Sequence, residues 1–444
     1  MKKILVVVLA LCMICAFVAS CATKEQPASP TGTSSTKPSS GPATWFEPSG
    51  PRTTAERADA PAGDPISPPG IYFPGLENPG AVPKKQYFIA YAEGEMGDNF
   101  TRTLFNDVNG TAQKYVERFG IRWEYTISGN NSTQQLQDIQ SLIAKKPDLL
   151  IINPNEAEPL DIVVDWAYEA GIPIIMFDKE VVTQPGNKSL ISVITYDMFE
   201  QGVQVGVALV DYFTEKYGAP KGDVVEIAGI LGAVASIHRS QGMNLVFADY
   251  PDINVVASVD GEWDNAISYN VSQDILSAFP PGTIDAIVGN CDESSFAFME
   301  AAGAVGRLEE FGAGFAGMDS PVLALEYILD GRYTATAENG PYHGMNVLEY
   351  AIQFLNGVKI PERVWIPNRF YRVTNDEQRK ALEEVIQKCK AGEFEFVPAS
   401  LGYFDKFPAR PPAVEKIYPV PIAEDPARYA NVPYYKVTPS TIRK

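Results

Sequence analysis

The feature that most limits the possible folds is an alternation of strand-like and helix-like segments that begins at Gln86. Residues 87–92 (YFIAYA) are typical of a buried strand, and residues 100–120 show a helical pattern that ends at Gly120. Further strands are predicted at RWEYTI, DLLIIN, IPIIMF, LISVIT, DVVEIA, VVASVD, DAIVG and GFAGMD. Strands that alternate with helices predict parallel, doubly wound sheets. About a dozen strand candidates are too many for one sheet, so we expect an α/β fold with two such lobes.

Length and composition agree with this expectation. The 444 residues suffice for two domains that each bury a core. The apolar fraction of 45% and the charged fraction of 20% are near the averages of soluble globular proteins, which argues against wholesale disorder and against a polytopic membrane protein. The net charge of −19 repels phosphate backbones, so no nucleic-acid partner is expected.

The N-terminus has the layout of an export signal. Lys2 and Lys3 precede the apolar run ILVVVLALCMICAFV, which small residues follow and which is short for a membrane-spanning helix. The sequence VASC at 18–21 resembles the lipobox of bacterial lipoproteins. This resemblance implies that residues 1–20 are a cleaved signal peptide and that Cys21 carries a lipid. The protein would then be exported and anchored to the cell membrane, facing the periplasm or the cell exterior. An ordinary signal peptide with an incidental cysteine explains less.

Few cysteines remain after such processing. Cys12 and Cys15 would leave with the signal, so that the folded body keeps Cys291 and Cys389. A disulfide framework is not indicated, and pairing of these two distant cysteines stays open.

Two segments differ from the alternating body. Residues 21–85 are rich in Pro, Ser, Thr and Gly and are typical of a flexible tether. Residues 375–444 begin with an amphipathic helix, capped by Asn375 and ended by Gly392, and continue as a Pro- and Tyr-rich extension that suits a strip lying over the body.

Polar and aromatic residues follow many of the predicted strands. In open parallel sheets a ligand lies beyond the carboxyl ends of the strands, where loops and helix N-termini converge. The residues at these positions include Asp98, Asn99, Phe100, Asn153, Asp178, Lys179, Arg239, Trp263, Asn290, Asp292 and Asp319. Carboxylates, amides and a guanidinium pair with ring hydroxyls, and flat aromatic rings cover the apolar faces of a sugar. The excess of aspartates over Arg239 and Lys179 favours a neutral ligand over an anionic one.

Residues 86–374 resemble the type I periplasmic binding proteins, in particular the ribose- and galactose-binding group that serves ABC sugar importers. The resemblance rests on the strings GDNF, LLIINPNEAEPL, IPIIMFDKE, SIHRSQGM, VDGEWD, GFAGMDS and ATAENGPYHG. It implies sugar contacts from Asp98, Asn153, Asp178, Lys179, Arg239, Asp319 and Asn339, and ring stacking by Phe100 and Trp263. The family usually reads ND where this chain has Asn290-Cys291-Asp292, so either Asn290 or Asp292 takes that place. An Asp-rich calcium loop is absent around KYGAPKGDV, so no structural calcium is expected. We expect no other metal and no cofactor.

The resemblance also implies the domain layout and the mechanism. One lobe would contain residues 86–195 and 340–358, and the other residues 196–339 and 359–374, with hinge crossings near 195–197, 339 and 358–362. A monosaccharide would bind one lobe first, closure would complete the site, and the closed monomer would deliver the sugar to an ABC permease. One alternative is a sensor that binds a sugar or another small polar ligand and presents its closed form to a receptor kinase or chemoreceptor. A glycan-active enzyme is a more remote alternative.

Structural roles compete with these site assignments. Asp98 and Phe100 could serve as helix cap and core residue, and Trp263 could be a core aromatic. Asp178, Asp319, Asn153 and Asn339 could support turns, and Arg239 could only bridge the lobes. Catalysis is not expected, because only two histidines, His238 and His343, are available for a metal site or a serine triad. The string GILG at 229–232 lacks the full glycine spacing of a dinucleotide loop.

Overall fold

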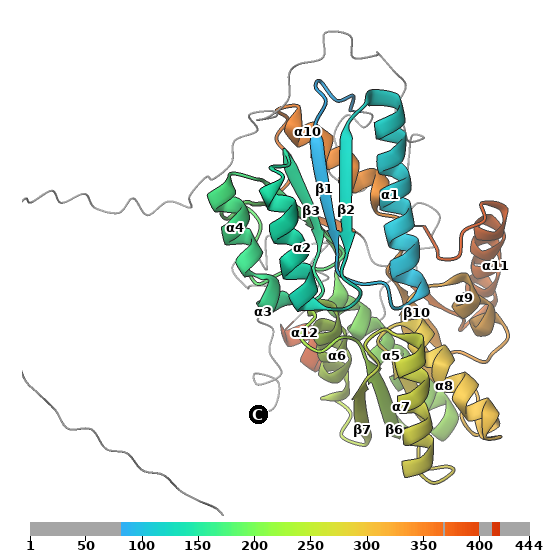
Figure 1. Cartoon of the computed structure of the whole chain (residues 1–444). Coiled ribbons are helices and arrows are strands. Elements are labelled where there is room, and N and C mark those ends of the chain that lie inside the picture. The colour runs from blue at the N-terminus through green and yellow to red at the C-terminus, as the bar shows by residue number, and fades with distance from the viewer. Residues whose placement is uncertain (1–80, 367–368, 399–410, 418–444) are drawn as a thin grey trace, which may run out of the picture. The chain divides into compact units, whose positions relative to one another are not determined.

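Two six-stranded sheets organise this protein (Figure 1). The structure is a computed structural model, and it describes residues 81–366, 369–398 and 411–417. All of these residues lie in one unit that runs from Ala43 to Lys444. The predicted signal peptide, the lipid site at Cys21 and most of the predicted tether therefore lie outside the described residues.

The first lobe is built on a parallel sheet with strand order β11-β5-β4-β3-β1-β2. Its strands are β1 Phe88–Glu93, β2 Arg122–Ile127, β3 Leu149–Asn153, β4 Ile174–Phe177, β5 Leu190–Tyr196 and β11 Arg363–Ile366. Its helices are α1 Asn99–Phe119, α2 Ser132–Ala144, α3 Ala157–Leu160, α4 Ile162–Ala170 and α10 Gly344–Leu355. Alternate residues of β1 point to opposite faces, so one core forms with α1 and α10 and another with α2 and α4.

The second lobe repeats the plan with strand order β12-β10-β9-β8-β6-β7, in which β12 is antiparallel. Its strands are β6 Gly222–Ala228, β7 Ile253–Asp260, β8 Ala286–Gly289, β9 Phe315–Asp319, β10 Ala335–Glu338 and β12 Phe370–Arg372. The surrounding elements are α5 Met198–Tyr217, α6 Val234–Phe247, α7 Asn265–Ala278, α8 Asp292–Ala304, η1 Leu308–Glu310, α9 Val322–Leu329, α11 Asp376–Ala391 and α12 Pro412–Ile417. The predicted doubly wound α/β fold with two lobes is confirmed.

Local sequence signals fix the ends of several helices. The Asp98 carboxylate accepts from the backbone N–H of Thr101 and caps α1, which ends at Gly120 in a left-handed conformation (φ 67°). The Asn375 side chain likewise caps α11, and Gly392 ends it. Both helices agree with the sequence prediction.

The chain crosses between the sheets three times. It leaves the first sheet after Tyr196, returns after Glu338 and crosses again between Ile366 and Phe370. The first two crossings match the expected positions. The third does not lie at 358–362, because β11 pairs in parallel with β5. The expected assignment of residues 359–374 to the second lobe is therefore corrected: β11 belongs to the first lobe and β12 to the second.

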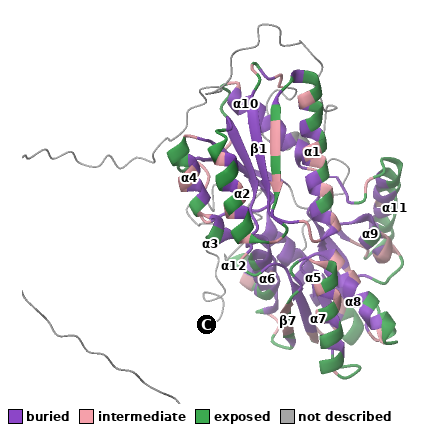
Figure 2. Ribbon diagram, viewed as in Figure 1, coloured by how far each residue is buried: buried purple, intermediate pink, exposed green. Residues whose placement is uncertain are grey.

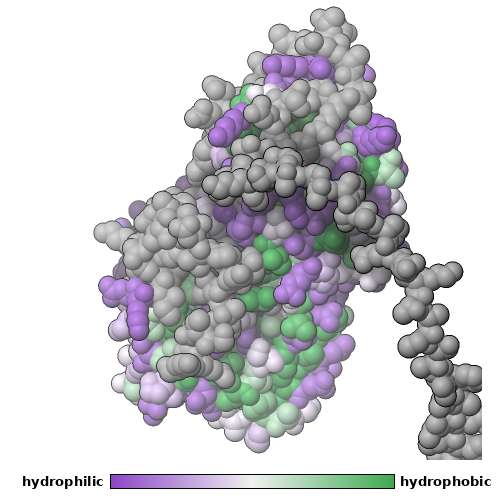
Figure 3. All heavy atoms as spheres, turned by 90° about the vertical axis from the view of Figure 1, so that its left-hand side faces the viewer, coloured by the Kyte–Doolittle hydropathy of each residue, from purple (hydrophilic) through white to green (hydrophobic). Residues whose placement is uncertain are grey.

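Burial follows the layers. Strand residues are mostly buried and the outer helix faces are exposed, whereas the edge strand β2 is partly exposed (Figure 2). On the face drawn in Figure 3, hydrophobic residues gather among polar ones over the second lobe. Within the part of the chain that the structure describes, no helix is long and apolar enough to cross a membrane. Cys291 and Cys389 are both buried and free, so they do not pair.

The start of the described chain is held against the first lobe. The backbone N–H of Ala81 donates to Glu349 Oε1 over 2.6 Å, and Lys84 Nζ donates to the carbonyl oxygen of Asn356 over 3.1 Å. The last residues of the predicted tether thus pack on the body.

Candidate functional site

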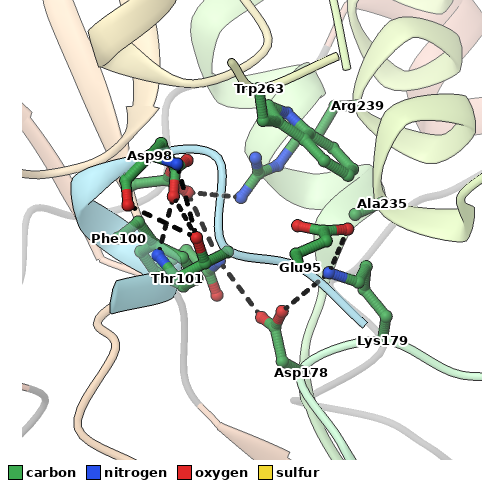
Figure 4. Close-up of a pocket in the computed structure, with 11 residues that line it drawn as sticks. Glu95, Asp98, Phe100, Thr101, Asp178, Lys179, Ala235, Arg239 and Trp263 are labelled. Atoms are coloured by element: carbon green, nitrogen blue, oxygen red, sulfur yellow. Dashed lines mark hydrogen bonds and ion pairs between the residues drawn. The ribbon is translucent and has the colours of Figure 1, made fainter. Parts of the chain in front are cut away.

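A small pocket lies where the carboxyl ends of the two sheets face each other (Figure 4). It encloses about 280 Å³ that protein atoms do not fill, part of which is open to solvent. The lining residues are Glu95, Asp98, Phe100, Thr101, Asp178, Lys179, Ala235, Arg239, Trp263, Asp319 and Asn339.

The first lobe supplies an ammonium group between two carboxylates (Figure 4). Lys179 Nζ donates to Glu95 Oε1 over 2.6 Å and lies 3.6 Å from Asp178 Oδ2. Burial opposes the charge on Lys179, but the neighbouring Glu95 and Asp178 outweigh it and raise the pKa of the ammonium. Burial raises the pKa of Glu95 to about 8, against the attraction of Lys179.

A second buried acid, Glu93, lies behind the pocket wall that Glu95 and Lys179 form. Asn153 Nδ2 donates to Glu93 Oε1 over 3.0 Å, and the Tyr91 hydroxyl donates to the other carboxylate oxygen. Burial raises the pKa of Glu93 to about 7. Asn153 therefore lies behind the pocket wall and holds Glu93, which precedes the lining residue Glu95 by two positions.

The second lobe supplies a guanidinium group with a partner on each nitrogen. Arg239 Nε donates to Gln201 Oε1 over 2.7 Å. Its Nη1 donates to the carbonyl oxygen of Asn290, and its Nη2 donates to Asp319 Oδ1, each over 2.6 Å. Burial raises the pKa of Asp319 to about 6, although Arg239 opposes this rise. The fork of Arg239 is thus fixed in one orientation.

Two aromatic rings from different lobes line the same pocket. The Trp263 ring lies 5.4 Å from Lys179 Nζ, and its indole N–H points to the carbonyl oxygen of Asn290 at 3.4 Å. A Cβ atom at Gly229 would lie 2.1 Å from the indole, so only glycine fits there. Phe100 comes from the first turn of α1.

Three lining residues have an unusual backbone conformation. Asp178 has φ 60°, Trp263 has φ 52° and Asp319 has φ 102°. Non-glycine residues rarely adopt this region, and a bulky residue such as tryptophan does so at a cost of about 1–3 kcal/mol. Such strain persists where the surrounding structure holds a side chain in place, which is typical of ligand sites.

Eight of the twelve predicted site residues line this pocket, and four do not. Asn153 lies behind the wall. Asn290 contributes its carbonyl oxygen to Arg239 and Trp263. Asp292 accepts hydrogen bonds from the Ser320 N–H and from the hydroxyls of Tyr333 and Thr336, and so ties strands of the second lobe together.

Asn99 lies at the contact between the lobes rather than in the pocket. Its backbone N–H donates to Glu293 Oε2 over 3.0 Å. Burial, followed by the nearby charge of Asp98, raises the pKa of Glu293 to about 8.

Three lining residues were not predicted: Glu95, Thr101 and Ala235. Glu95 follows β1 as an acid in the string YAEGEM, so the rule applied to other strand ends would have found it. Thr101 and Ala235 have no such signal, because they lie within the first turn of a helix and do not directly follow a strand.

The competing structural role of Asp98 is present together with its place in the pocket. Asp98 Oδ1 accepts from the Thr101 N–H and from the Thr101 hydroxyl, each over 2.7 Å. Burial raises the pKa of Asp98. One oxygen of this carboxylate therefore caps α1, while the residue lines the pocket.

Neither histidine lines the pocket. Burial lowers the pKa of His238 to about 3 and that of His343 to about 4, so both imidazoles are neutral at physiological pH. Among residues 81–366, 369–398 and 411–417, no group of three or more His, Cys, Asp and Glu side chains is arranged to hold a metal ion.

Comparisons with known proteins agree with this geometry. The ribose import binding protein of Salmonella typhimurium is 28% identical over 258 residues, which are 58% of this chain and 82% of that protein. A solute-binding protein of an ABC transporter from Mycobacterium smegmatis, solved with bound glycerol, superposes with a TM-score of 0.60 at 22% identity and covers 70% of this chain and 99% of that one.

A third similar structure is the fructose-binding periplasmic domain of a hybrid two-component system. It has a TM-score of 0.56 and 26% identity, and the match covers 69% of this chain and 98% of that one. The family model described as "Periplasmic binding protein domain" matches residues 96–357, more than half of the chain. The chain therefore belongs to the periplasmic binding protein family and has its type I fold.

Proposed function

We propose that this protein is an exported solute-binding protein that holds a small neutral sugar between its two lobes and delivers it to an ABC importer. The family and the names of its relatives support a sugar-binding protein of the importer type. The observation that favours a neutral polyhydroxylated ligand is that the charged groups of the pocket already pair with one another.

The balance of donors and acceptors supports this choice. Lys179 and Arg239 are engaged by Glu95 and Asp319, so little positive charge is left for an anionic ligand. Four carboxylates in one pocket offer many acceptor oxygens, which hydroxyl groups can satisfy as donors. Trp263 and Phe100 supply flat apolar surfaces for the C–H faces of a ring.

Contacts between the lobes support closure as the mechanism. The Asn99 N–H reaches Glu293, and the Ala157 N–H reaches the carbonyl oxygen of Gly232 over 3.2 Å. Residues of the first lobe thus form hydrogen bonds with residues of the second at two separate places. A ligand that contacts both lobes shifts the population toward this closed arrangement.

Anchoring by a lipid on Cys21 belongs to the same proposal. The VASC string at 18–21 supports it. Mass spectrometry of the membrane-extracted protein would test it, since a diacylated Cys21 as the first residue is expected and an unmodified residue at that position would contradict it.

A binding screen tests the sugar assignment. Pentoses, hexoses, disaccharides, uronic acids and sugar phosphates are each added to the purified protein, and thermal unfolding and equilibrium dialysis are measured. A ligand at a hundred times its Kd stabilises the folded state by about 2.7 kcal/mol. We expect this shift with at least one neutral sugar, loss of it in Trp263→Ala, and none with sugar phosphates. Absence of a shift with every neutral sugar would refute the assignment.

A sensor is the second candidate, because one similar structure is a fructose-binding domain of a two-component system. In that case the closed form would be read by a receptor and not by a permease. Sugar uptake in a strain that lacks this protein separates the two candidates: transport predicts loss of uptake, and sensing predicts unchanged uptake with a lost transcriptional response. Recovery of the unchanged sugar after prolonged incubation with the protein would argue against an enzymatic function.

A further inference from the structure

The segment that follows α11 contacts both lobes at the edge of the pocket. Residues 393–398 lie outside the part of the chain that matches the family model. The preceding helix α11 packs on α9 of the second lobe, where Lys390 pairs with Glu326 over 2.5 Å. The segment therefore starts from the second lobe.

Backbone pairing fixes the segment to the loop after β9. The Val322 N–H donates to the Glu395 carbonyl oxygen over 2.8 Å, and the Val397 N–H donates to the Ser320 carbonyl oxygen over 3.1 Å. Phe396 forms an antiparallel bridge with Pro321 between these two bonds. Ser320 directly follows Asp319, which lines the pocket, so the segment braces that wall.

The side chains of the consecutive residues Phe396 and Val397 pack into different hydrophobic cores. Val397 is fully buried among second-lobe residues that include Val322 and Leu325. Phe396 is 1% exposed and packs edge-on against Phe100 of α1, with ring centroids 5.8 Å apart. Because Phe100 lines the pocket, Phe396 supports the first-lobe wall from behind.

Polar and aromatic contacts add to the connection with the first lobe. Asn99 Nδ2 donates to Glu395 Oε2 over 2.6 Å. The Phe394 ring packs edge-on against Tyr342, with centroids 5.2 Å apart, next to the second hinge crossing.

We propose that residues 393–398 form an interlobe strap that holds the lobes closed, and that Phe396 is a positioning residue that holds Phe100 against the ligand pocket. Closure buries Phe396 between α1 and the loop after β9, whereas opening would expose part of this ring to water. The strap thus favours the closed arrangement before any ligand binds. Ligand affinity rises in proportion to the fraction of ligand-free molecules that are already closed.

Hydrogen exchange of the ligand-free mature protein tests the strap without knowledge of the sugar. The Ala157 N–H donates to Gly232 of the other lobe, and none of the contacts described for the strap involves either residue. Its exchange therefore reports lobe opening and not local loosening of the strap. We expect Phe396→Ala to speed exchange in the peptide that contains Ala157 by about tenfold, with exchange of the β3 core unchanged.

Phe119→Ala is the matched control, because Phe119 lies in the same hydrophobic cluster at the far end of α1. It should leave the Ala157 peptide as in the wild type. Glu395→Ala is a milder variant at an exposed position, and it should speed the same peptide to a smaller extent. The strap is refuted if Phe396→Ala and Glu395→Ala alter exchange only near residues 320–322 and 393–398, or if Phe119→Ala has the same effect.

Dissociation of a sugar found in the binding screen tests the positioning role. Phe396→Ala should raise the dissociation rate by about tenfold, and Phe119→Ala should not. An unchanged rate in Phe396→Ala would contradict positioning of Phe100. A screen that yields no sugar would refute the proposed function but leave the exchange experiment on the strap intact.

Discussion

At the scale of single residues, the site depends on a few side chains with no freedom to reorient. Arg239 is the clearest case, because Gln201, Asn290 and Asp319 each hold a different nitrogen of one guanidinium. These acceptors are buried, so each needs its donor to remain favourable in the folded protein. Arg239 therefore lines the pocket in one fixed orientation and also contributes to stability.

We expect Arg239→Lys to destabilise the protein by about 1–3 kcal/mol for each acceptor left without a donor. A lysine keeps the charge but cannot reproduce the planar fork. Urea denaturation measures the loss. Arg332→Lys is the control, since its pair with Asp330 is half exposed and should change stability by about 0.5 kcal/mol or less. Equal losses in the two variants would show that the guanidinium of Arg239 is not needed.

At the scale of secondary-structure elements, the start of α1 combines helix capping with a place in the pocket wall. Asp98 caps α1 and lines the pocket. Asparagine is as good a cap as aspartate, so Asp98→Asn should leave the free energy of unfolding within about 0.5 kcal/mol of the wild type, whereas Asp98→Ala should lower it by about 1 kcal/mol. Both variants should weaken sugar binding, as measured by calorimetry. Wild-type affinity in Asp98→Asn would mean that the carboxylate only caps the helix.

Close packing of α5 on α6 places Arg239. A Cβ atom at Gly202 would lie 2.0 Å from the Arg239 carbonyl oxygen, which is backbone and cannot move aside alone. We expect Gly202→Ala to cost about 1–3 kcal/mol by overpacking and to weaken sugar binding. Gly110→Ala in α1 is the control, because nothing lies within 4 Å of its Cβ position. That variant should be stabilised by up to about 1 kcal/mol. Thermal unfolding and calorimetry measure both effects, and a Gly202→Ala protein with wild-type stability would contradict the packing argument.

Most of the strands and the ends of two helices could be predicted from the sequence. The strands from β1 to β9 are runs of β-branched and aromatic residues, and α1 and α11 carry their own caps and stops, so local pattern was sufficient. The short strands β10, β11 and β12 were missed because three or four residues become a strand only through their neighbours. Phe396 was missed for the same reason: its burial depends on Phe100, almost 300 positions away in the chain.

At the scale of the whole molecule, acidic groups of opposite lobes lie close together. Glu293 of α8 accepts the Asn99 N–H at the start of α1, close to the Asp98 carboxylate. In this closed arrangement burial and Asp98 raise the pKa of Glu293 to about 8. We expect the proposed opening to return the side chain to water, where a glutamate has a pKa near 4.3. The closed form therefore binds a proton that the open form releases at any pH between these two values.

Sugar affinity should consequently depend on pH. Because the closed form holds the extra proton, closure becomes more favourable as the pH falls from about 8 toward 5, by at most about tenfold per pH unit. We expect Kd from calorimetry to fall over this range, with proton uptake visible as a dependence of the heat on buffer ionisation. Glu293→Gln should make the profile less steep, because an amide has no proton to gain, while the raised pKa values of Glu95 and Asp319 leave part of the pH dependence in place. Glu300→Gln, at an exposed position of the same helix, should leave it unchanged. Parallel profiles for the wild type and Glu293→Gln would place the titrating group elsewhere and remove Glu293 from the energetics of closure.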